Sequence, residues 1–500
     1  MTNPQRSSAA RVIIAGAGPV GLLLAHELAL AGVPVLVLEK EERRSPHSKA
    51  LGIHARTIEV LAMRNLHHEA LASGRRIPNW HFGMLQTRVD LSSLPTPFPY
   101  LLVQPQVATE ELLERHATER GAVIRRCHQV TSLVQDDSSV TVRVSGPDGP
   151  YEVNAPYVVG TDGARSTVRQ SAGIDFPGSD TSVYGFLGEV HLDDPPSTPG
   201  FTAHSDYGRL LVIPLPDGGF RVTGYDPANQ QRDVPLTLDE LRETSLRIAG
   251  TDFGMRSPTW LSRFGDATRL AATYREGRVL LAGDAAHIHW PTGGVGLNVG
   301  LQDAMNLGWK LAAVVQGRAD PKLLATYHAE RHPVGAELSA HTMAQTALIT
   351  GLTPGVNALR GLLTEAIATE PDFSRMLAGK LSGLDTVYRS ADPDAHPLTG
   401  ARAHDREGDG VLPLLHDGRA VLLAMDDSPV DGEVAERAAV AGISIHPSRL
   451  SETGGPAWAG VTAALIRPDG HVWWASEQPR SELGFAAEVT KALDGLPAVF

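Results

Sequence analysis

A glycine turn between a buried strand and a helix restricts the fold of this chain more than any other feature. Residues 16–21 read GAGPVG and match the pattern GxGxxG. The apolar, β-branched run Arg11–Ala15 precedes them, the helix-forming run Leu22–Ala31 follows, and Val33–Leu38 is a second apolar run. Parallel strands joined by a right-handed helical crossover form a βαβ unit, so the sequence predicts an α/β domain built on a parallel sheet.

The residue types in this turn suit a dinucleotide. Gly16 allows the tight turn off the strand, Gly18 lets the backbone approach a pyrophosphate, and Gly21 permits close packing of helix and strand. The helix N-terminus offers free N–H groups and the positive end of its dipole to the phosphates. Glu39 closes the second strand, where a carboxylate can bind a ribose 2′-hydroxyl. The alternative is a glycine turn without a ligand, and the turn alone does not separate FAD from NAD.

Two later segments repeat the pattern of a strand that ends in glycine and aspartate. Asp162-Gly163 follows an apolar strand; it suits a polar ligand at the sheet edge, or alternatively Asp162 caps the next helix. Gly283-Asp284 ends a second such strand, where Asp284 can accept hydrogen bonds from ribityl hydroxyls. The glycine loop Pro291–Asn298 then leads into a long helix and suits a ring lying against the backbone. Three such elements in one chain favour FAD.

The rest of the chain changes character twice. Between about 180 and 265, helical periodicity gives way to alternating, turn-broken segments, which predict an antiparallel sheet inserted between two halves of the first domain. Residues 277–315 return to the α/β pattern, and residues 330–390 are mostly helical. Short strands follow in residues 400–500, after a link rich in Pro, Asp and His. The sequence therefore predicts more than one domain.

Composition excludes several classes of partner. The 500 residues carry 44 Lys and Arg against 57 Asp and Glu, a net charge of −13, which gives no electrostatic reason to bind nucleic acid or an anionic membrane. The longest apolar stretches, Val20–Leu30 and Val33–Leu38, are too short to span a bilayer. A single cysteine, Cys127, fits a reducing compartment. We therefore expect a cytoplasmic protein that acts on a small molecule.

These motifs resemble those of the single-component (class A) flavoprotein aromatic hydroxylases. The similarity is closest to the aromatic polyketide hydroxylases of tetracycline and angucycline type and to rifampicin monooxygenase. Four phrases carry it: Ser48–Val60, Trp260–Arg269, Tyr274–His289 and Leu301–Ala313. The resemblance covers essentially the whole chain and is weakest at 180–250.

The resemblance implies an α/β fold with three parts: a Rossmann-like FAD-binding domain, an inserted mixed-sheet substrate domain and a C-terminal thioredoxin-like domain. The phrase Leu465–Trp474 looks like the last of these. With Cys127 as the sole cysteine, that domain has no dithiol chemistry and is expected to be structural or an oligomer contact. The expected bounds are 1–180 with 265–395 for the FAD-binding domain, 181–264 for the substrate domain and 396–500 for the thioredoxin-like domain.

The resemblance also implies where FAD lies. The glycine turn and Glu39 hold the ADP part, Gln106 reaches the ribityl or pyrophosphate region, and Val130 meets the adenine through its backbone. Asp284 binds the ribityl or pyrophosphate, and Pro291–Asn298 runs beside the isoalloxazine. The full predicted cofactor set is Gly16, Ala17, Gly18, Pro19, Val20, Gly21, Glu39, Lys40, Lys49, Gln106, Val130, Asp162, Gly283, Asp284, Pro291, Gly294, Val295, Gly296, Leu297 and Asn298.

Three positions depart from the family pattern. Many relatives have Arg in place of Lys49, and Lys lacks the planar group that can lie against a flavin. The loop that often reads PPTGGQGLN has Trp290 and Val295 here, which add a bulky ring and remove an amide. Both changes affect the expected substrate pocket, for which we also predict Phe82 and Arg221, with Trp290 as a third substrate residue. Phe82 lies in a strand-like stretch, NWHFGML, that is expected to line the pocket, with core packing as the alternative. For Arg221 the alternative is a solvent-facing position.

The activity implied is that of an FAD-dependent monooxygenase. NADPH or NADH reduces FAD as a transient co-substrate, dioxygen adds to form a C4a-hydroperoxyflavin, and one oxygen enters an aromatic polyketide or related polycyclic compound. Alternatives on the same scaffold are Baeyer–Villiger oxygen insertion, an antibiotic-inactivating or sequestering flavoprotein, and a simple FAD oxidase or dehydrogenase. The sequence identifies no catalytic base, and the chain is expected to be a monomer or homodimer.

Two histidine pairs could suggest a metal site. His287 and His289 lie inside a flavin phrase without supporting carboxylates, and His328 and His332 are spaced i, i+4 on a predicted helix. We interpret the first pair as part of the flavin segment and the second as a packed or surface pair, so no metal is expected.

Overall fold

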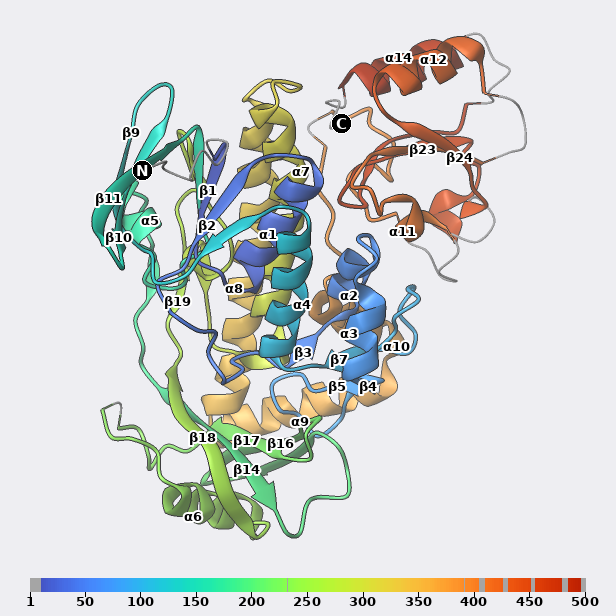
Figure 1. Ribbon diagram of the computed structural model, residues 1–500. Coiled ribbons are helices and arrows are strands. Elements are labelled where there is room, and N and C mark those ends of the chain that lie inside the picture. Colours follow the sequence, from blue (N-terminus) through green and yellow to red (C-terminus); the bar gives the residue numbers. More distant parts are fainter. Residues whose placement is uncertain are drawn as a thin grey trace.

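The computed structural model describes residues 10–231, 233–390, 392–403, 410–425, 430–450, 455–478 and 484–495. The outer limits of the predicted first and last domains, at residues 1 and 500, lie outside them. Within these residues the chain has a mixed α/β fold (Figure 1). A parallel sheet with long helices, an antiparallel sheet and a smaller C-terminal sheet occupy separate regions of the molecule.

The predicted βαβ unit is confirmed. β1 (Val12–Ala15), α1 (Pro19–Leu30) and β2 (Val35–Leu38) follow in order, and the two strands pair in parallel. Pro19 at the first helical position is pre-set for the first turn, and Gly32, with φ of 73°, lets the chain leave the helix. Since α1 is apolar almost all round, it is buried, with α7 and α4 packed against it.

The parallel sheet has the strand order β20-β21-β12-β1-β2-β8, in which the edge strand β20 runs antiparallel. Three more small sheets belong to the same region. Besides β1 and β2, the parallel sheet contains β8 (Val123–Arg125), β12 (Tyr157–Gly160), β20 (Arg275–Glu276) and β21 (Val279–Leu281). The first small sheet contains β9 (Gln129–Gln135), β10 (Val140–Gly146) and β11 (Gly149–Ala155), and the second contains β13 (Gly178–Ser179), β19 (Thr268–Leu270) and β22 (His287–Ile288). The third contains β3 (Gly52–Ile53), β4 (Arg75–Ile77) and β7 (Leu101–Val103).

The region predicted to be an inserted sheet contains β14 (Tyr184–Leu192), β15 (Phe201–Ser205), β16 (Gly208–Pro214), β17 (Phe220–Tyr225) and β18 (Met255–Gly265). Their order is β15-β16-β17-β14-β18, and each pairing that the structure describes is antiparallel. The mixed sheet implied by the resemblance is therefore wrong, whereas the antiparallel sheet read from the alternation is confirmed. Short turns join β15 to β16 and β16 to β17, whereas α6 (Leu238–Ala249) lies between β17 and β18.

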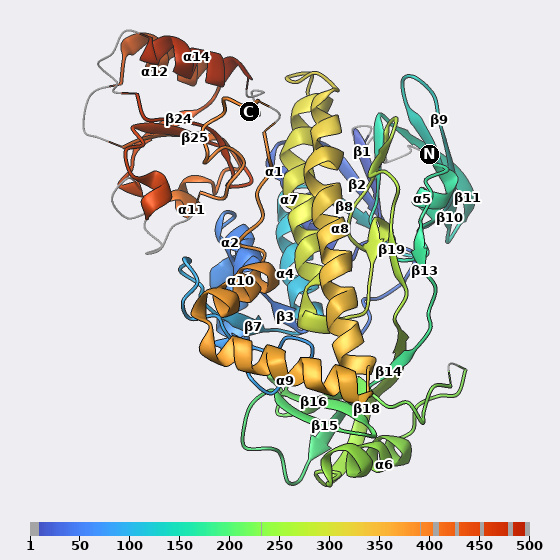
Figure 2. The ribbon, with the colours of Figure 1, turned by 180° about the vertical axis from the view of Figure 1, so that it is seen from behind.

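Long helices connect these regions (Figure 2). α7 and α8 run side by side along the molecule, and α9 crosses the end of α8 next to the antiparallel sheet. The helices of the first 400 residues are α1, α2 (Ala55–Ala62), α3 (His67–Ser73), α4 (Gln106–Glu119), α5 (Thr167–Ser171), α6 (Leu238–Ala249), η1 (Gly283–Ala285), η2 (Thr292–Gly294), α7 (Gly296–Val315), α8 (Leu323–Thr350), α9 (Pro354–Thr369) and α10 (Pro371–Ser382).

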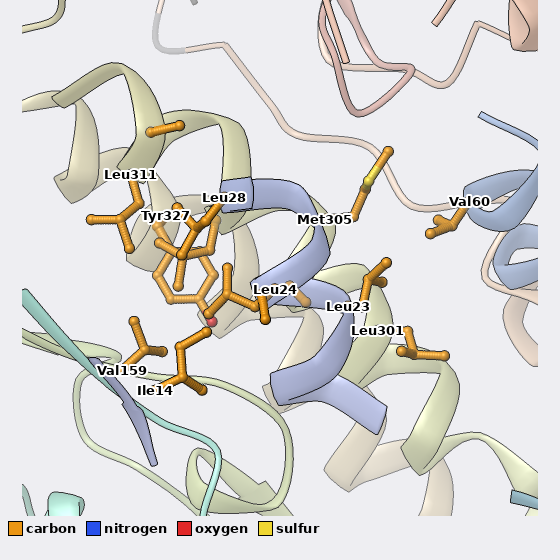
Figure 3. Close-up of a cluster of buried hydrophobic side chains, with 14 of the residues drawn as sticks. Ile14, Leu23, Leu24, Leu28, Val60, Val159, Leu301, Met305, Leu311 and Tyr327 are labelled. Atoms are coloured by element: carbon orange, nitrogen blue, oxygen red, sulfur yellow. The ribbon is translucent and has the colours of Figure 1, made fainter. Parts of the chain in front are cut away.

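The main core lies between the parallel sheet and these helices (Figure 3). Ile14 and Val159 project from adjacent strands, Leu24 comes from α1, and Leu311 and Tyr327 come from α7 and α8. All five side chains are fully buried. Burial of apolar area on this scale is the main force that fixes the sheet edge on which the glycine turns lie.

The C-terminal region has its own sheet, with the order β24-β23-β25-β26. β23 and β24 are parallel, and the two later strands add antiparallel. This region contacts the rest of the chain through the β25–β26 turn, where a Cβ added at Gly470 would lie 2.6 Å from Met63 Sδ of the segment after α2. Its elements are α11 (Val411–Leu414), β23 (Val421–Ala424), α12 (Gly432–Val440), β24 (Ser444–Pro447), η3 (Pro456–Trp458), β25 (Ala463–Ile466), β26 (Val472–Ser476) and α14 (Phe485–Gly495).

One predicted strand is shorter than expected. The stretch NWHFGML was read as strand-like, but β5 (Asn79–Trp80), paired with β6 (Val89–Asp90), ends before Phe82. Gly83 and Met84 have φ of 55° and 52°, which turn the chain out of the extended conformation. Phe82 thus lies in a turn.

Candidate functional site

The glycine turn is packed too tightly for any side chain at two of its three glycines. Gly16 has φ of 102°, and a Cβ there would lie 2.5 Å from the carbonyl oxygen of Thr161. A Cβ on Gly21 would lie 2.2 Å from Gly16 O. Thr161 Oγ1 lies 2.9 and 3.0 Å from the carbonyl oxygens of Ala15 and Gly16, which joins the end of β12 to this turn. The first two motifs predicted from sequence are therefore in contact.

Gly18 differs from its neighbours because it faces open space. No heavy atom of the described residues lies within 4 Å of a Cβ built on it, and its φ of −76° is one that any residue adopts. Gly18 is the N-cap of α1, and no described side chain caps that helix end. A helix N-terminus with an open approach fits a pyrophosphate, so the turn has the shape that FAD requires.

Glu39 lies beside this opening at the carboxyl end of β2. Its Oε2 accepts a hydrogen bond from Ala17 N at 2.8 Å, and its Oε1 accepts one from Glu41 N at 2.9 Å. The side chain is half-buried and is thereby fixed next to the glycine turn. Lys40 is exposed, with its ammonium 3.8 Å from a carboxylate oxygen of Glu41. The Glu39 carboxylate is therefore held at the end of β2, next to the glycine turn.

Asp162 caps α5. Its carboxylate accepts hydrogen bonds from Ser166 Oγ at 2.5 Å and from Val168 N at 3.1 Å, as the capping alternative predicted. Gly163 next to it has φ of 81° and no heavy atom of the described chain within 4 Å of a built Cβ. The carboxylate is largely committed to the helix, and the open space of this turn lies at the glycine.

The Gly283-Asp284 pair meets the glycine turn from the other side. Gly283 has φ of 61°, and a Cβ there would lie 2.9 Å from Val20 Cγ2. Gly283 N donates to Asp303 Oδ2 at 3.2 Å. Asp284 follows with an exposed side chain. The structure thus brings together three segments that lie far apart in the sequence, with Asp284 free to bind a polar ligand.

Asn298 fixes the glycine loop by its side chain. Asn298 Nδ2 donates to Gly294 O at 2.8 Å and to Gly52 O at 2.9 Å, while Oδ1 accepts from His54 N at 2.8 Å. His54 Nε2 lies 2.9 Å from Gly293 O and donates to it in the matching tautomer. Asn298 and His54 therefore attach the loop to β3, and ligand contacts of the loop are left to its backbone and to Gly294, whose built Cβ meets no described atom.

The remaining predicted loop residues differ in how far their side chains are exposed to solvent. Val295 is buried and Pro291 is exposed, whereas Gly296 and Leu297 are half-buried. Trp290 is buried, with its ring 4.9 Å from that of Phe264 in an edge-to-face arrangement. The bulky ring that departs from the family pattern packs onto β18 of the antiparallel sheet and ties the loop to it.

Gln106, Lys49 and Val130 lie around the segment that follows β2. Gln106 Oε1 accepts from Ala50 N at 3.1 Å, and its Nε2 donates to Glu110 at 2.7 Å. Lys49 is exposed, and Val130 is buried in β9. The amide of Gln106 is therefore engaged with the chain itself in this structure.

Arg221, predicted as a substrate residue, is buried, and its two Nη atoms both donate hydrogen bonds within the chain. It donates to Glu189 Oε1 at 2.5 Å, to Lys49 O at 3.1 Å and to Ser48 O. Its guanidinium lies 5.5 Å from the ring centre of Trp260. The solvent-facing alternative is wrong, since Arg221 clamps the antiparallel sheet to the segment containing Lys49.

Phe82 is buried and lies edge-to-face with His341 of α8, ring centres 5.3 Å apart. Gln345, one turn further along α8, accepts from Gly83 N at 3.0 Å and from Thr292 Oγ1 at 3.1 Å. A cleft that opens to solvent adjoins this region, lined by His341, by Val295 and by residues of α7, α8 and α10. Phe82 therefore packs on the helix that supports the glycine loop.

Sequence reasoning missed His54, Gln345 and Asp303. His54 and Asp303 lie in two of the phrases that carry the family resemblance, Ser48–Val60 and Leu301–Ala313, which was the one available signal. Gln345 lies outside such a phrase, and its contacts to residues 83 and 292 span more than 50 positions. No local pattern reveals pairs of that separation.

Burial keeps His54 neutral and lowers its pKa to about 4 from 6.5. Between these two values the unfolded chain carries a proton on this residue that the folded chain lacks. Stability therefore falls on acidification through this window, by up to about 1.4 kcal/mol per pH unit, and His54 contributes nothing to the slope above pH 6.5. We predict that His54→Gln, which keeps a donor toward Gly293, flattens the dependence of Tm on pH between 6.5 and 4.

The measurement is thermal unfolding of both proteins across that range. Buried His81 and His471 and half-buried His341 also have lowered pKa values, so both proteins keep a slope of the same sign from them. The difference between the two curves isolates His54. Parallel curves would contradict the prediction.

His287 and His289 have partners within the chain. His287 Nε2 contacts Asp303 at 2.8 Å, and His289 Nδ1 contacts Trp290 O at 2.6 Å. His328 and His332 pack with ring centres 4.7 Å apart, as the packed-pair interpretation predicted. Among the described residues no three His, Cys, Asp or Glu side chains gather as a metal site would require. In the same part of the chain, no helix has the length and apolar character to cross a membrane.

Comparison with known families matches nearly the whole chain. The family described as FAD binding domain matches residues 9–342, and the family described as aromatic-ring hydroxylase, C-terminal, matches residues 396–495. An uncharacterized aromatic compound monooxygenase of Bacillus subtilis is 44% identical over 475 residues, covering 93% of each chain.

Three relatives from Streptomyces carry more specific names. A 12-dehydrotetracycline 5-monooxygenase/anhydrotetracycline 6-monooxygenase of Streptomyces rimosus is 44% identical over 93% of this chain and 95% of its own. A rifampicin monooxygenase of Streptomyces venezuelae is 43% identical over 94% and 97%. A dialkyldecalin synthase of Streptomyces rugosporus is 37% identical over 93% and 96%.

The solved structures agree. An anhydrotetracycline hydroxylase from Streptomyces rimosus superposes with a TM-score of 0.85 at 41% identity, covering 97% of this chain and 99% of that one. An aromatic hydroxylase from angucycline biosynthesis gives 0.83 at 40% identity, covering 96% and 99%. Fold and sequence therefore point to the same group of proteins.

Proposed function

This chain belongs to the FAD-dependent aromatic-ring hydroxylases and is an FAD-dependent monooxygenase, and from that premise we propose that it hydroxylates an aromatic polyketide or related polycyclic compound at the expense of NADPH or NADH. FAD, when bound, supplies the electron transfer from the nicotinamide and the activation of dioxygen. The protein supplies binding, orientation and exclusion of water.

The observation that carries the proposed FAD site is the open space at Gly18. Gly16 and Gly21 are closed by backbone atoms within 2.5 Å of a built Cβ, but Gly18 between them meets nothing among the described residues. In this proposal the pyrophosphate occupies that space at the N-terminus of α1. The half-buried carboxylate of Glu39 then receives the ribose, and exposed Asp284 receives the ribityl chain.

The proposed ring site lies between the glycine loop and the antiparallel sheet. Asn298 and His54 hold the loop on one side, and the edge-to-face contact of Trp290 with Phe264 holds it on the other. We assign the backbone of Pro291–Asn298 to the isoalloxazine. A loop fixed from both sides gives a ring a defined position, which oxygen transfer to one carbon requires.

The domain division is also a proposal. We infer an FAD-binding domain at 1–180 and 265–395, a substrate domain at 181–264, and a thioredoxin-like domain at 396–500. The order β23-α12-β24 in parallel, followed by β25, β26 and α14, supports the last of these. Since Cys127 is the sole cysteine, that domain acts without a dithiol, and a reducing cytoplasm suits the protein.

The substrate class rests on the relatives. The names of two of them give tetracycline intermediates and rifampicin as substrates, and this chain matches both along nearly their full length. The predicted substrate residue Phe82 packs against α8, and Trp290 packs against β18. These two elements support the glycine loop. We propose a flat polycyclic substrate in contact with these side chains, while Arg221 has a structural role.

The test is oxygen incorporation by the purified, FAD-loaded protein. Polycyclic polyketides and ansamycins are screened for compounds that speed NADPH or NADH oxidation, and the products are analysed by mass spectrometry under ¹⁸O₂. One labelled oxygen per product supports the proposal. A product without label would contradict it and would point to chemistry such as that of the synthase relative. NMR of the product separates a new hydroxyl from Baeyer–Villiger insertion into the ring.

A further inference from the structure

A buried carboxylate on α7 contacts the turn assigned to the ribityl chain. Asp303 is fully buried, and its Oδ2 accepts from Gly283 N at 3.2 Å and lies 2.8 Å from His287 Nε2. These two partners flank the turn that contains Asp284. Because one oxygen atom contacts both ends of the turn, Asp303 determines where Asp284 projects.

The other oxygen of this carboxylate binds an equally buried arginine. Asp303 Oδ1 accepts from Arg331 Nε of α8 at 2.7 Å, and both side chains have no exposed surface. Arg331 Nη2 donates to Val299 O at 3.1 Å, in the turn of α7 that follows Asn298. The pair therefore spans the turn at Gly283 and the end of the glycine loop, the two segments assigned to the ribityl chain and the ring.

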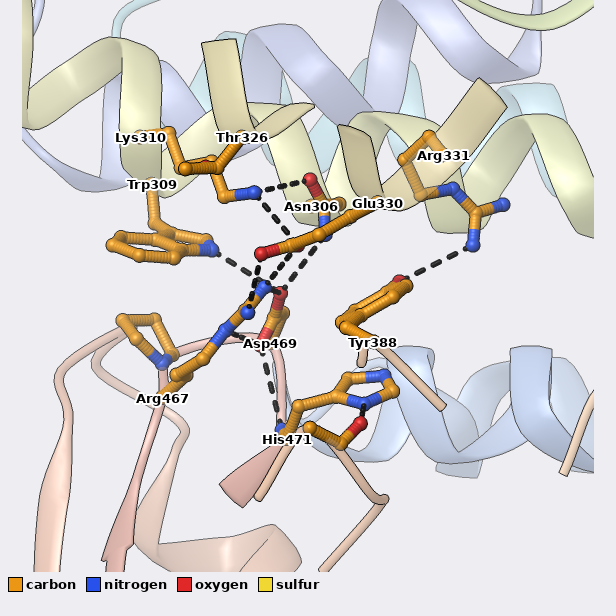
Figure 4. A network of polar contacts seen from close by, with 12 residues as sticks. Asn306, Trp309, Lys310, Thr326, Glu330, Arg331, Tyr388, Arg467, Asp469 and His471 are labelled. Atoms are coloured by element: carbon orange, nitrogen blue, oxygen red, sulfur yellow. Dashed lines mark hydrogen bonds and ion pairs between the residues drawn. The ribbon is translucent and has the colours of Figure 1, made fainter. Parts of the chain in front are cut away.

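A third partner connects this pair with the C-terminal region (Figure 4). Arg331 Nη1 donates to the hydroxyl of Tyr388 at 3.2 Å. The Tyr388 ring lies 4.2 Å from that of His471, and the Arg467 guanidinium lies 5.1 Å from its centre. Both residues lie at the β25–β26 turn of the C-terminal sheet. A continuous buried path thus runs from that sheet to the flavin turn.

We propose that Asp303 and Arg331 are positioning residues for FAD and that Tyr388 makes the C-terminal region part of the same arrangement. A buried ion pair contributes little net stability compared with apolar side chains of the same volume. What this pair does contribute is a fixed distance between two ligand-facing segments, each held through a backbone group. The inference rests on the proposed placement of FAD, and it explains why the phrase containing Asp303 accompanies the flavin motifs.

The test compares Asp303→Asn and Tyr388→Phe with a matched control, Asp226→Asn. Asp226 is a buried carboxylate of the sheet region that accepts from Thr244 and Arg247, away from the flavin turn. For each protein we measure the Tm without FAD, the Kd for FAD by fluorescence titration of folded apoprotein, and the visible absorption spectrum of bound FAD.

The expected result is that Asp303→Asn raises the Kd about tenfold or more, as loss of an orienting partner does at metal sites, and shifts the flavin bands. Tyr388→Phe removes the hydrogen bond to buried Arg331 Nη1, so it is expected to raise the Kd about threefold and to lower the Tm as well. Asp226→Asn lowers the Tm but leaves Kd and spectrum as in the wild type. If Asp303→Asn does not fold, the Kd for FAD and the flavin spectrum of Tyr388→Phe provide the test.

Variants of Asp303 and Tyr388 with wild-type Kd and spectrum, whatever their Tm, would overturn this inference alone. A wild-type protein that takes up no FAD would instead overturn the proposed function. The two failures are therefore separated by the first titration.

Discussion

Gly18→Ala is expected to abolish most FAD binding while the protein stays folded. The built Cβ meets no described atom, and φ of −76° with ψ of 178° suits alanine, so the apoprotein gains no clash and no strain. The methyl group instead enters the space assigned to the pyrophosphate. We expect the Kd for FAD to rise about 100-fold, or about 2.8 kcal/mol, in a fluorescence titration, with the Tm of the apoprotein unchanged.

Gly21→Ala is the matched comparison, since it adds the same methyl group one turn away. That Cβ would lie 2.2 Å from Gly16 O and 2.6 Å from Thr161 Oγ1, so helix and strand must move apart. We expect a lower apoprotein Tm, as in other overpacked cores. If Gly18→Ala bound FAD as tightly as the wild type, the assignment of the pyrophosphate to this turn would be wrong.

The second large effect is expected at the contact between the C-terminal region and the long helices. Arg467 is buried, and it donates two hydrogen bonds of 2.9 Å to Glu330 of α8 and further ones to Asp469 (Figure 4). Lys310 adds a second buried cation 2.7 Å from Glu330. The positive charges of Arg467 and Lys310 thus balance the negative charges of two carboxylates, those of Glu330 and Asp469. Arg467→Met leaves one buried negative charge without compensation, which costs about 3–5 kcal/mol.

We expect this substitution to lower the Tm by about 3–5 °C, measured by calorimetry or circular dichroism. The control is Arg437→Met in the same region, which removes an ion pair with Asp494 whose side chains are 47% and 51% exposed. Exposed pairs contribute at most about 1 kcal/mol, so little change is expected there. Equal effects of the two substitutions would show that the buried network does not hold the region in place.

Local patterns predicted the parts of the fold that local physics determines. The βαβ unit and the antiparallel sheet follow from apolar periodicity and turn residues, and both were found. The strand expected through Phe82 failed, because the turn at Gly83 and Met84 depends on packing against α8 that a short window does not contain.

The site was predictable at its glycines and less so at its side chains. Gly18 and Glu39 lie where the GxGxxG pattern placed them. Asp162, by contrast, caps a helix, and Arg221 is engaged by partners up to 173 positions away. Asp303 pairs with Arg331 across two helices. Such contacts arise only when distant segments meet, so a single sequence does not reveal them.

The clamp at Arg221 has a consequence for engineering new substrate preference. This side chain joins β17 to the segment at Lys49. Variants of Arg221 would therefore weaken the attachment of the antiparallel sheet and would not simply change substrate preference. Leu211 and Ile213 on neighbouring β16 belong to the same apolar cluster as Phe82 and make no such link. Volume-conserving apolar substitutions at those two positions would change the packing around Phe82 while the contacts of Arg221 stay in place.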